Sequence, residues 1–396
     1  MSNQLETEST DDDLCGWDQY ASRAGILGHR LVAGDFPPAR EDRADGLAHL
    51  AQQLTCWTNW YVGHADSRRP AFQRQNDLVT PWGGPNADNV YRHARVTPGR
   101  RYRIRGRMNT CEEFMLAVRA GFMHEEVWGT LFEISATDLG LGEGDEFEFF
   151  VGGPDDPVPL PDRAAMVSIR EYYFDWRPQE PATFTIECVD ADVDAPADRL
   201  DPETVQARLR TAITATEHSI ENWNRYLLER KSDGPANQFR PPHKVSKGLA
   251  AARYGFCIWD LGPDEALLVE SDVPDARYWS LQLYEMAWYE LVDPSERITS
   301  LNHRQVHVDD DGRFRVVLAH NDPGVANWLD TAGRQEGLLT FRWFWQRGVD
   351  PSPAARVIRI DDAQALAAKA GTSVTQTERL DTMRARREHL AWRFRT

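Results

Sequence analysis

The chain has 396 residues, of which 41% are hydrophobic, so it can build packed cores and is not a wholly disordered protein. This length exceeds one ordinary core, and we expect two domains. The formal net charge of −17 argues against nucleic acid and anionic membranes as partners, because their phosphate groups would be repelled.

Cysteine usage and the N-terminus indicate a cytoplasmic protein. The 5 cysteines are odd in number, widely spread and without a CxxC pair, so neither a disulfide framework nor a structural zinc site is suggested. The acidic start MSNQLETESTDDD is the reverse of a signal peptide. No window approaches the roughly 18 apolar residues of a transmembrane helix, so we expect no membrane span.

Four segments are expected along the chain. They are a disordered or extended N-terminal segment (1–37), a helix plus a first β-sandwich (38–200), a connecting helix and linker (201–249), and a second β-sandwich plus a C-terminal helix (250–396).

Apolar spacing predicts the helices. PAREDRADGLAHLAQQLTCWTNWYVGHA places Leu50, Leu54 and Trp57 three or four residues apart. The helix DPETVQARLRTAITATEHSIENWNRYLLERK opens with Asp201 as a cap before Pro202. The basic segment VTQTERLDTMRARREHLAWRFRT is also expected to be helical. Between these segments, alternating stretches such as NVYRHARV, RYRIRGR and TFTIECVD predict strands.

Part of the chain is repeated. Three pieces of the first half recur in the second half in the same order: PGRRYRIRGRMN (from Pro98) as PDARYWSLQLYEM (from Pro274), DEFEFFVGGPDDP (from Asp145) as DGRFRVVLAHNDP (from Asp311), and REYYFDWRPQEPATFTIECVD (from Arg170) as RWFWQRGVDPSPAARVIRID (from Arg342). The sequence therefore predicts a mainly β protein with flanking helices, in which two duplicated antiparallel β-sandwich (jelly-roll-like) units are joined by a long helix.

Several of these stretches resemble known families. GGPNADNVYRHARV, from Gly83, resembles the GPNPDTLY-type signature of domain-of-unknown-function family 1254. YWSLQLYE from Tyr278, DDDGRF, NWLDTAG from Asn327 and FRWFW from Phe341 resemble successive blocks of family 1214. The resemblance implies an α/β first domain and a jelly-roll-like second domain. It implies little about chemistry, because both families are named for an unknown function.

Two short stretches carry candidate acid–base groups. In GGPNADNVY, the polar residues either serve a local turn or project Asp88 and Tyr91 into a pocket. In GFMHEEVWG, a strand would place His124, Glu126 and Trp128 on one face. A histidine and a carboxylate beside an aromatic wall could run general acid–base chemistry, whereas the alternative is a solvated edge with an ion pair.

Metal and anion sites receive weaker support. In NHRQVHVDDDG, a strand would place His303, His307 and Asp309 on one face, but no third ligand has a recognisable spacing, so no metal is expected. The run RRYRIRGR places four arginines on one strand face. They form either an anion site or, as we expect, a solvated edge that deters strand-to-strand aggregation.

We expect a ligand cavity between the two sandwiches, lined by some of the 14 tryptophans. The expected function is that of a cofactor-independent enzyme acting on a hydrophobic or aromatic small molecule by acid–base chemistry. The alternatives are a non-catalytic carbohydrate- or lipid-binding protein and a structural partner in a larger complex, and a homo-oligomer is possible. The predicted catalytic residues are His124, Glu126 and Asp88, and the predicted substrate-binding residues are Tyr91, Trp128, Tyr278 and His303. Substitutions of the catalytic residues should abolish turnover and leave the melting temperature nearly unchanged.

Overall fold

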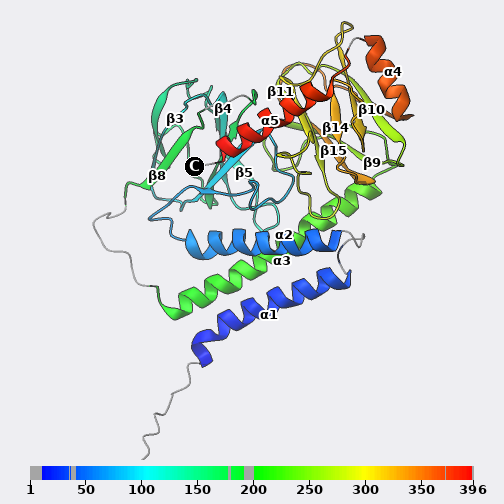
Figure 1. Ribbon diagram of the computed structural model, residues 1–396. Coiled ribbons are helices and arrows are strands. Elements are labelled where there is room, and N and C mark those ends of the chain that lie inside the picture. Colours follow the sequence, from blue (N-terminus) through cyan, green and yellow to red (C-terminus); the bar gives the residue numbers. More distant parts are fainter. Residues whose placement is uncertain are drawn as a thin grey trace, which may run out of the picture.

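The computed structural model describes residues 11–34, 36, 42–176, 180–190, 200–370 and 372–394. The helices are α1 (Asp11–Ala33), α2 (Asp42–Thr58) with the π-helical turn η1 (Asn59–Gly63), α3 (Pro202–Ser232), α4 (Ile360–Ala370) and α5 (Gln376–Arg393). Two strand-rich halves lie side by side, with α1, α2 and α3 along one side of both and α5 lying across their junction (Figure 1). None of the helices described here is long and apolar enough to cross a membrane.

The first half contains two sheets of antiparallel strands. Its strands are β1 (Gln73–Arg74), β2 (Asn89–Arg95), β3 (Tyr102–Arg107), β4 (Glu113–Arg119), β5 (Thr130–Ser135), β6 (Glu146–Val151), β7 (Met166–Tyr172) and β8 (Thr183–Cys188). Sheet A has the order β1-β2-β7-β4-β5 and sheet B the order β6-β3-β8. The α/β first domain implied by the family resemblance is therefore wrong, because the named strands of this half pair only in antiparallel fashion.

The second half again contains two sheets. Its strands are β9 (Ala252–Asp260), β10 (Glu265–Asp272), β11 (Ala276–Tyr284), β12 (Ser300–Asn302), β13 (Arg313–Ala319), β14 (Trp328–Asp330), β15 (Glu336–Gln346) and β16 (Ala354–Arg359). Sheet C has the order β12-β11-β15-β9 and sheet D the order β14-β13-β10-β16. Helix α3 joins the halves, so the chain is mainly β, with two β-sandwich units joined by a helix.

Strand order reveals which pieces of the halves are equivalent. Sheet A without β1 (β2-β7-β4-β5) matches sheet C (β9-β15-β11-β12), and sheet B (β6-β3-β8) matches β13-β10-β16 of sheet D. Two of the three sequence matches respect this equivalence: β6 with β13, and β7–β8 with β15–β16. The third is wrong, because RYRIRGR forms β3, whose equivalent is β10, whereas YWSLQLY forms β11, whose equivalent is β4. Alternating strands share a period of two whatever their place in a sheet, so their likeness did not identify equivalent strands.

The sheets pack in layers. One core fills the space between sheets A and B, and includes Val90, Ile104 and Ile186. A second lies between sheets C and D, and includes Leu281 and Val316. Sheets A and C also contact each other, through a buried cluster from both halves that consists of Met115, Ala117, Tyr172, Phe174, Leu249, Ala252, Tyr278 and Phe344. The junction between the halves is therefore a packed interface.

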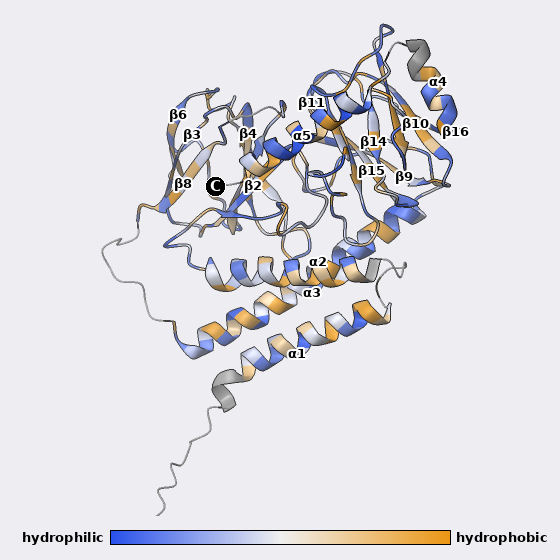
Figure 2. Ribbon diagram, in the orientation of Figure 1, coloured by the Kyte–Doolittle hydropathy of each residue, from blue (hydrophilic) through white to orange (hydrophobic). Residues whose placement is uncertain are grey.

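The N-terminal expectation needs correction. Residues 11–33 were expected to be disordered or extended, but they form α1, which packs on α3 and α2, while residues 1–10 and 37 lie outside the described residues. Hydrophobic residues occur at intervals along α1 and α3 (Figure 2). Leu27 and Leu31 of α1 are buried against Ile213 and Ile220 of α3. Burial of one apolar face stabilises a helix that is otherwise polar.

Three local expectations are also wrong. Residues 121–129 form a loop, so His124, Glu126 and Trp128 share no strand face. His303 lies in a turn after β12, and so does not share a strand face with His307. The arginine run is on the central strand of sheet B, not on an edge, and its side chains pair with acidic residues of neighbouring segments, including Glu187 and Glu146.

Candidate functional site

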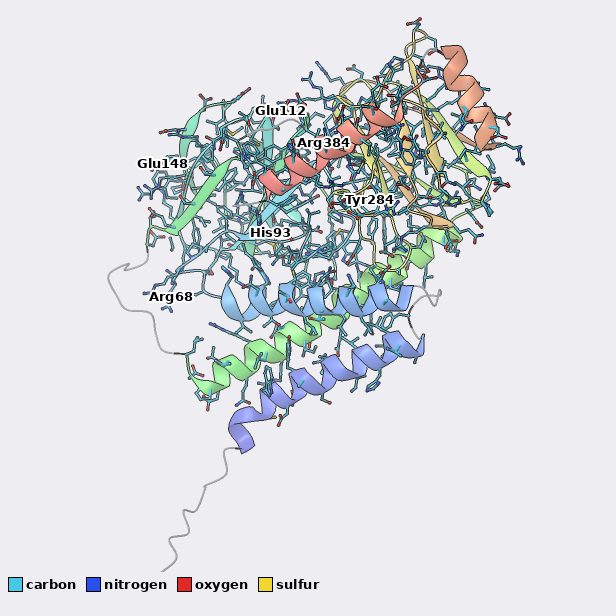
Figure 3. The ribbon with its side chains drawn as sticks, viewed as in Figure 1. Arg68, His93, Glu112, Glu148, Tyr284 and Arg384 are labelled. Carbon is cyan, nitrogen blue, oxygen red and sulfur yellow. The ribbon has the colours of Figure 1, made fainter. Side chains whose placement is uncertain are left out.

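A cavity of about 100 Å³ lies where sheets A and C meet α3. Its ionisable lining residues come from strands of both halves: Tyr91 and His93 from β2, Arg119 from β4 and Arg170 from β7, with Tyr254 from β9 and Arg342 from β15. Aromatic walls complete it: Trp82, Trp223, Tyr226, Phe256 and Tyr289. Figure 3 labels His93 in the first half and Tyr284, which contacts Arg342, in the second half.

Strand register repeats one arrangement in both halves. Tyr91 of β2 is the Cα partner of Arg170 in β7, and Tyr254 of β9 is the Cα partner of Arg342 in β15. Each guanidinium lies over its tyrosine ring, with the Arg170 carbon Cζ 5.5 Å and the Arg342 Cζ 5.7 Å from the ring centre. The duplication thus contributes an arginine–tyrosine pair from each half to one cavity.

Arginines of the cavity lack acidic partners. Among the residues that the structure describes, no carboxylate forms an ion pair with Arg119, Arg170 or Arg342, and no Asp or Glu lines the cavity. Burial, reinforced by the charge of Arg170, lowers the pKa of Arg119 to about 10, so this side chain is still protonated at neutral pH. Arg342 donates to Tyr284 Oη and, at 3.4 Å, to the carbonyl of Gly84, while its Nε is buried and has no partner in the part of the chain that the structure describes. The cavity is a concentration of positive charge in an acidic protein.

His93 is a buried histidine that lines the cavity. The side chain is buried in β2, with Nδ1 2.8 Å from Ser168 Oγ and Nε2 without a hydrogen-bond partner in the described structure. Burial, and then the charges of Arg119 and Arg170, lower the pKa of His93 well below its ordinary value. The imidazole is therefore uncharged at neutral pH, and its Nε2 can accept or donate a hydrogen bond according to the tautomer.

The loop before β2 forms one wall of the cavity. Gly83 and Gly84 both have left-handed φ values, +64° and +65°, and a Cβ at Gly84 would lie 2.3 Å from Tyr289 Cζ. The Gly84 amide donates to the Tyr289 carbonyl at 2.8 Å. Two adjacent glycines are needed here, because the backbone turns in a conformation that other residues rarely adopt and passes directly over an aromatic ring.

Asp88 lies outside the cavity, at the centre of a buried polar network. Its Oδ1 accepts hydrogen bonds from Trp176 Nε1 and Asn302 Nδ2, both at 2.7 Å, and its Oδ2 accepts one from Tyr278 Oη at 2.6 Å. His303 adds a ring contact, with its centre 5.8 Å from that of Tyr278. The structure therefore brings together the predicted residues Asp88, Tyr278 and His303.

Helix α5 supplies the positive charge that balances Asp88. Arg386 and Arg393 are buried and lie over the Trp176 ring, with Cζ 4.1 and 5.0 Å from a ring centre. Burial lowers the pKa of each arginine to about 10, and the charge of Asp88 opposes this change. Arg393 also donates to the carbonyl of Ala87, so α5 ties this network in place.

Hydrogen bonds link this network to the cavity. The backbone N–H of Asn86 donates to Tyr91 Oη at 2.9 Å, and its side-chain Oδ1 accepts from Tyr278 Oη at 3.0 Å. On the other side, Tyr284 Oη, which receives Arg342, is 2.9 Å from Gln282 Oε1. Tyr91 is thus the predicted residue that both lines the cavity and contacts the Asp88 network.

His124, Glu126 and Trp128 are placed apart. His124 is buried but does not line the cavity, and it packs on Trp57 and Phe122 with ring centres 4.4 and 5.8 Å away. Burial, and then His218, lower its pKa to about 3. Glu126 is exposed, and Trp128 lies under Lys247, whose Nζ is 5.3 Å from the ring centre. The catalytic roles assigned to His124, Glu126 and Asp88 remain predictions.

His307 and Asp309, two residues considered as metal ligands, lie close together. His307 Nε2 is 3.7 Å from Asp309 Oδ1, and Asp309 is engaged by Arg315. Within the described ranges there is no group of three or more His, Cys, Asp or Glu side chains that could hold a metal ion.

Sequence reasoning missed four residues of the cavity, which are His93, Arg119, Arg170 and Arg342. A usable signal existed for two of them, because Arg170 and Arg342 begin the matched segments REYYFDW and RWFWQRG. A polar residue at the same position of two internal copies is a candidate for a shared site. Neither His93 nor Arg119 had such a signal, since no equivalent residue of the second half repeats it.

The chain is similar to one family model and to solved structures. The family model described as "Protein of unknown function (DUF1214)" matches residues 264–347. An uncharacterized protein from Burkholderia cenocepacia has a similar structure, with a TM-score of 0.81 and 25% identity over 88% of this chain and 98% of that chain. The VPA0106 protein from Vibrio parahaemolyticus is 10% identical over 85% of this chain and 99% of that chain, with a TM-score of 0.43. No curated protein matches the chain.

The resemblance of the first half to family 1254 remains a prediction. The match at residues 264–347 covers β10 to β15 and includes Tyr289 and Arg342 of the cavity. Residues 264–347 therefore match the DUF1214 family, whose description gives no function.

Proposed function

We propose that the protein binds a small molecule with a flat aromatic or apolar body in the cavity between its halves, and acts on it by acid–base chemistry without a cofactor. The observation that carries this proposal is the composition of the cavity wall, in which aromatic rings surround clustered ionisable groups. Enclosed apolar sites with a few convergent polar groups are typical of small-molecule binding.

His93 is the proposed proton-transfer group. It lines the cavity, its Nε2 has no partner among the described residues, and Ser168 holds the other ring nitrogen. A neutral imidazole whose orientation is fixed in this way can take a proton from a bound molecule or return one to it. The arginines alongside would stabilise negative charge that develops on that molecule.

A second candidate function is non-catalytic binding of a carbohydrate or lipid. It is favoured by the lack of any carboxylate among the residues that line the cavity, since acid–base enzymes commonly pair a base with an acid. We also propose a cytoplasmic location, which is supported by the free cysteines, of which Cys15 is exposed.

Binding is tested with ligand-induced fluorescence changes, because Trp82 and Trp223 both line the cavity. A panel of single-ring aromatic compounds should quench the protein's tryptophan emission and raise its melting temperature. Met123→Trp fills the cavity and should remove this response, whereas Val127→Trp, on the same loop but 49% exposed, should retain it. Equal responses from both variants would place the binding site elsewhere.

Catalysis is tested separately from binding. Wild-type protein is incubated with a metabolite extract in deuterated water, and mass spectrometry follows both compound loss and deuterium uptake. His93→Gln can keep a hydrogen bond to Ser168 and should lower the rate by about 10²–10⁴-fold. Binding without conversion or deuterium uptake would favour the non-catalytic alternative.

A further inference from the structure

We propose that the ligand of this cavity is a single-ring aromatic carboxylate, whose carboxylate is held by Arg119 and Arg170 and whose ring lies among the aromatic walls. This inference rests on the proposed function and adds the ligand's charge and size. It assigns to the arginines a role in binding rather than in holding the fold together.

The guanidinium groups of Arg119 and Arg170 are poorly satisfied within the protein. Arg119 is 7% exposed, and its Nε is buried without a hydrogen-bond partner among the described residues. In the described structure neither Arg119 nor Arg170 donates a side-chain hydrogen bond, and Arg170 lies over the ring of Tyr91. The charge of Glu125 acts on Arg119, but no ion pair joins them in the described structure. Burying a guanidinium without a paired counter-charge is costly, and placing two near each other adds repulsion. An anion in the cavity removes both penalties.

Two other arginines of sheets A and C do have acidic partners. Arg92 pairs with Glu171 at 2.5 Å, and Arg277 pairs with the fully buried Glu113. The chain carries 62 acidic residues, yet none of those that the structure describes lines this cavity. The cavity is positively charged although the protein has a net charge of −17, so it can attract a small anion. The negative charge of the whole protein would still repel nucleic acid.

The shape and size of the cavity limit the ligand. A guanidinium matches a planar carboxylate through two parallel hydrogen bonds. The cavity of about 100 Å³ is smaller than the ~150 Å³ apolar cavity that accepts benzene in an engineered protein, so a ligand with more than one ring would not fit inside it. Trp82, Phe256 and Tyr289 supply ring faces on which this aromatic body can pack.

The experiment measures binding by isothermal titration calorimetry with benzoate and with benzamide, which has nearly the same shape but no charge. Benzenesulfonate and inorganic phosphate test other anions. Benzoate should bind at least tenfold more tightly than benzamide, and phosphate should not compete. Arg119→Met and Arg170→Met should each reduce benzoate affinity about tenfold or more, while leaving benzamide affinity unchanged. Arg105→Met, which alters an exposed ion pair on sheet B, is the control and should have no effect.

The outcomes separate the two proposals. If benzamide and benzoate bind equally well, the ligand's charge is unimportant and this inference is wrong, while the proposed binding function stands. If phosphate or benzenesulfonate competes as well as benzoate, the carboxylate assignment is wrong. If no aromatic compound of either kind binds, the proposed function itself fails. Should Arg119→Met not fold, Arg119→Lys retains the charge without the forked donor and should weaken benzoate binding alone.

Discussion

Arg170 of β7 and Arg342 of β15 occupy equivalent positions in the two copies of one sheet, and each lies over a tyrosine of the adjacent strand. Their hydrogen bonds differ. Arg342 donates hydrogen bonds to Tyr284 and Gly84, whereas Arg170 donates none in the described structure. One copy of the arrangement is thus tied into the fold, and the other is left available to a ligand.

This asymmetry predicts different effects on stability. Arg342→Met removes hydrogen bonds from a buried guanidinium and should lower the free energy of unfolding by about 1–3 kcal/mol. Arg170→Met should change it by no more than about 0.5 kcal/mol, because no described hydrogen bond is lost. Urea denaturation of the ligand-free protein measures both. Equal losses would show that Arg170 is also structural.

Arg119→Met is expected to stabilise the ligand-free protein. The substitution keeps an apolar stem of similar length and removes a buried charge that lacks an ion-pair partner in the described structure, so the melting temperature should rise. The matched control is Arg277→Met, which leaves the buried carboxylate of Glu113 without its partner and should lower the melting temperature. A loss of stability in both variants would contradict the binding role of Arg119.

Asp88→Asn should destabilise the protein, contrary to the expectation from sequence that its melting temperature would hardly change. The carboxylate accepts three hydrogen bonds of 2.6–2.7 Å and balances the buried charges of Arg386 and Arg393. Removing one side of a buried charge pair typically costs about 3–5 kcal/mol. Chemical denaturation measures the loss, and the exposed substitution Asp310→Asn should be neutral. A neutral Asp88→Asn would mean that the arginines find another counter-charge.

Gly84→Ala should displace Tyr289 and weaken ligand binding. The new Cβ would lie 2.3 Å from the Tyr289 ring, and the residue would also keep a strained φ of +65°. Gly140→Ala is the matched control, because its φ is +74° and nothing lies within 4 Å of its Cβ. Both variants should lose about 1 kcal/mol of stability from backbone strain, but only Gly84→Ala should lose ring binding in calorimetry. If both variants bind the ligand equally well, Tyr289 does not contact it.

The buried His124 should make the protein sensitive to acid. Its pKa is lowered to about 3 in the folded protein, from an ordinary value of 6.5. Between these two pH values, His124 is therefore protonated in the unfolded chain and neutral in the folded protein. Stability from this group is therefore complete above pH 6.5 and falls as the pH drops, by up to about 1.4 kcal/mol per pH unit. In His124→Phe, unfolding free energies measured from pH 4 to pH 7 should depend less on pH. His29→Gln, at an exposed position, should retain the wild-type slope.

Sequence by itself determined the fold class, the repeat and the connecting helix. These follow from local patterns: alternation in β6 and β8 buries one face, and the Asp201 cap marks the start of α3. Strand β4 was missed because its residues, EFMLAVR, are buried on both faces and do not alternate in polarity. The sequence did not predict helix α1, because its apolar residues form a buried face only when α3 packs against them.

Only the tertiary structure decided the site. Tyr91, Arg170 and Arg342 meet because strand register places each arginine beside a tyrosine, and because sheets A and C then face each other. Register and sheet contact depend on hydrogen bonds between residues far apart in the chain, which no local period encodes. For the same reason His124 resembled a catalytic group in sequence, since its burial among aromatic rings is created by segments distant from it.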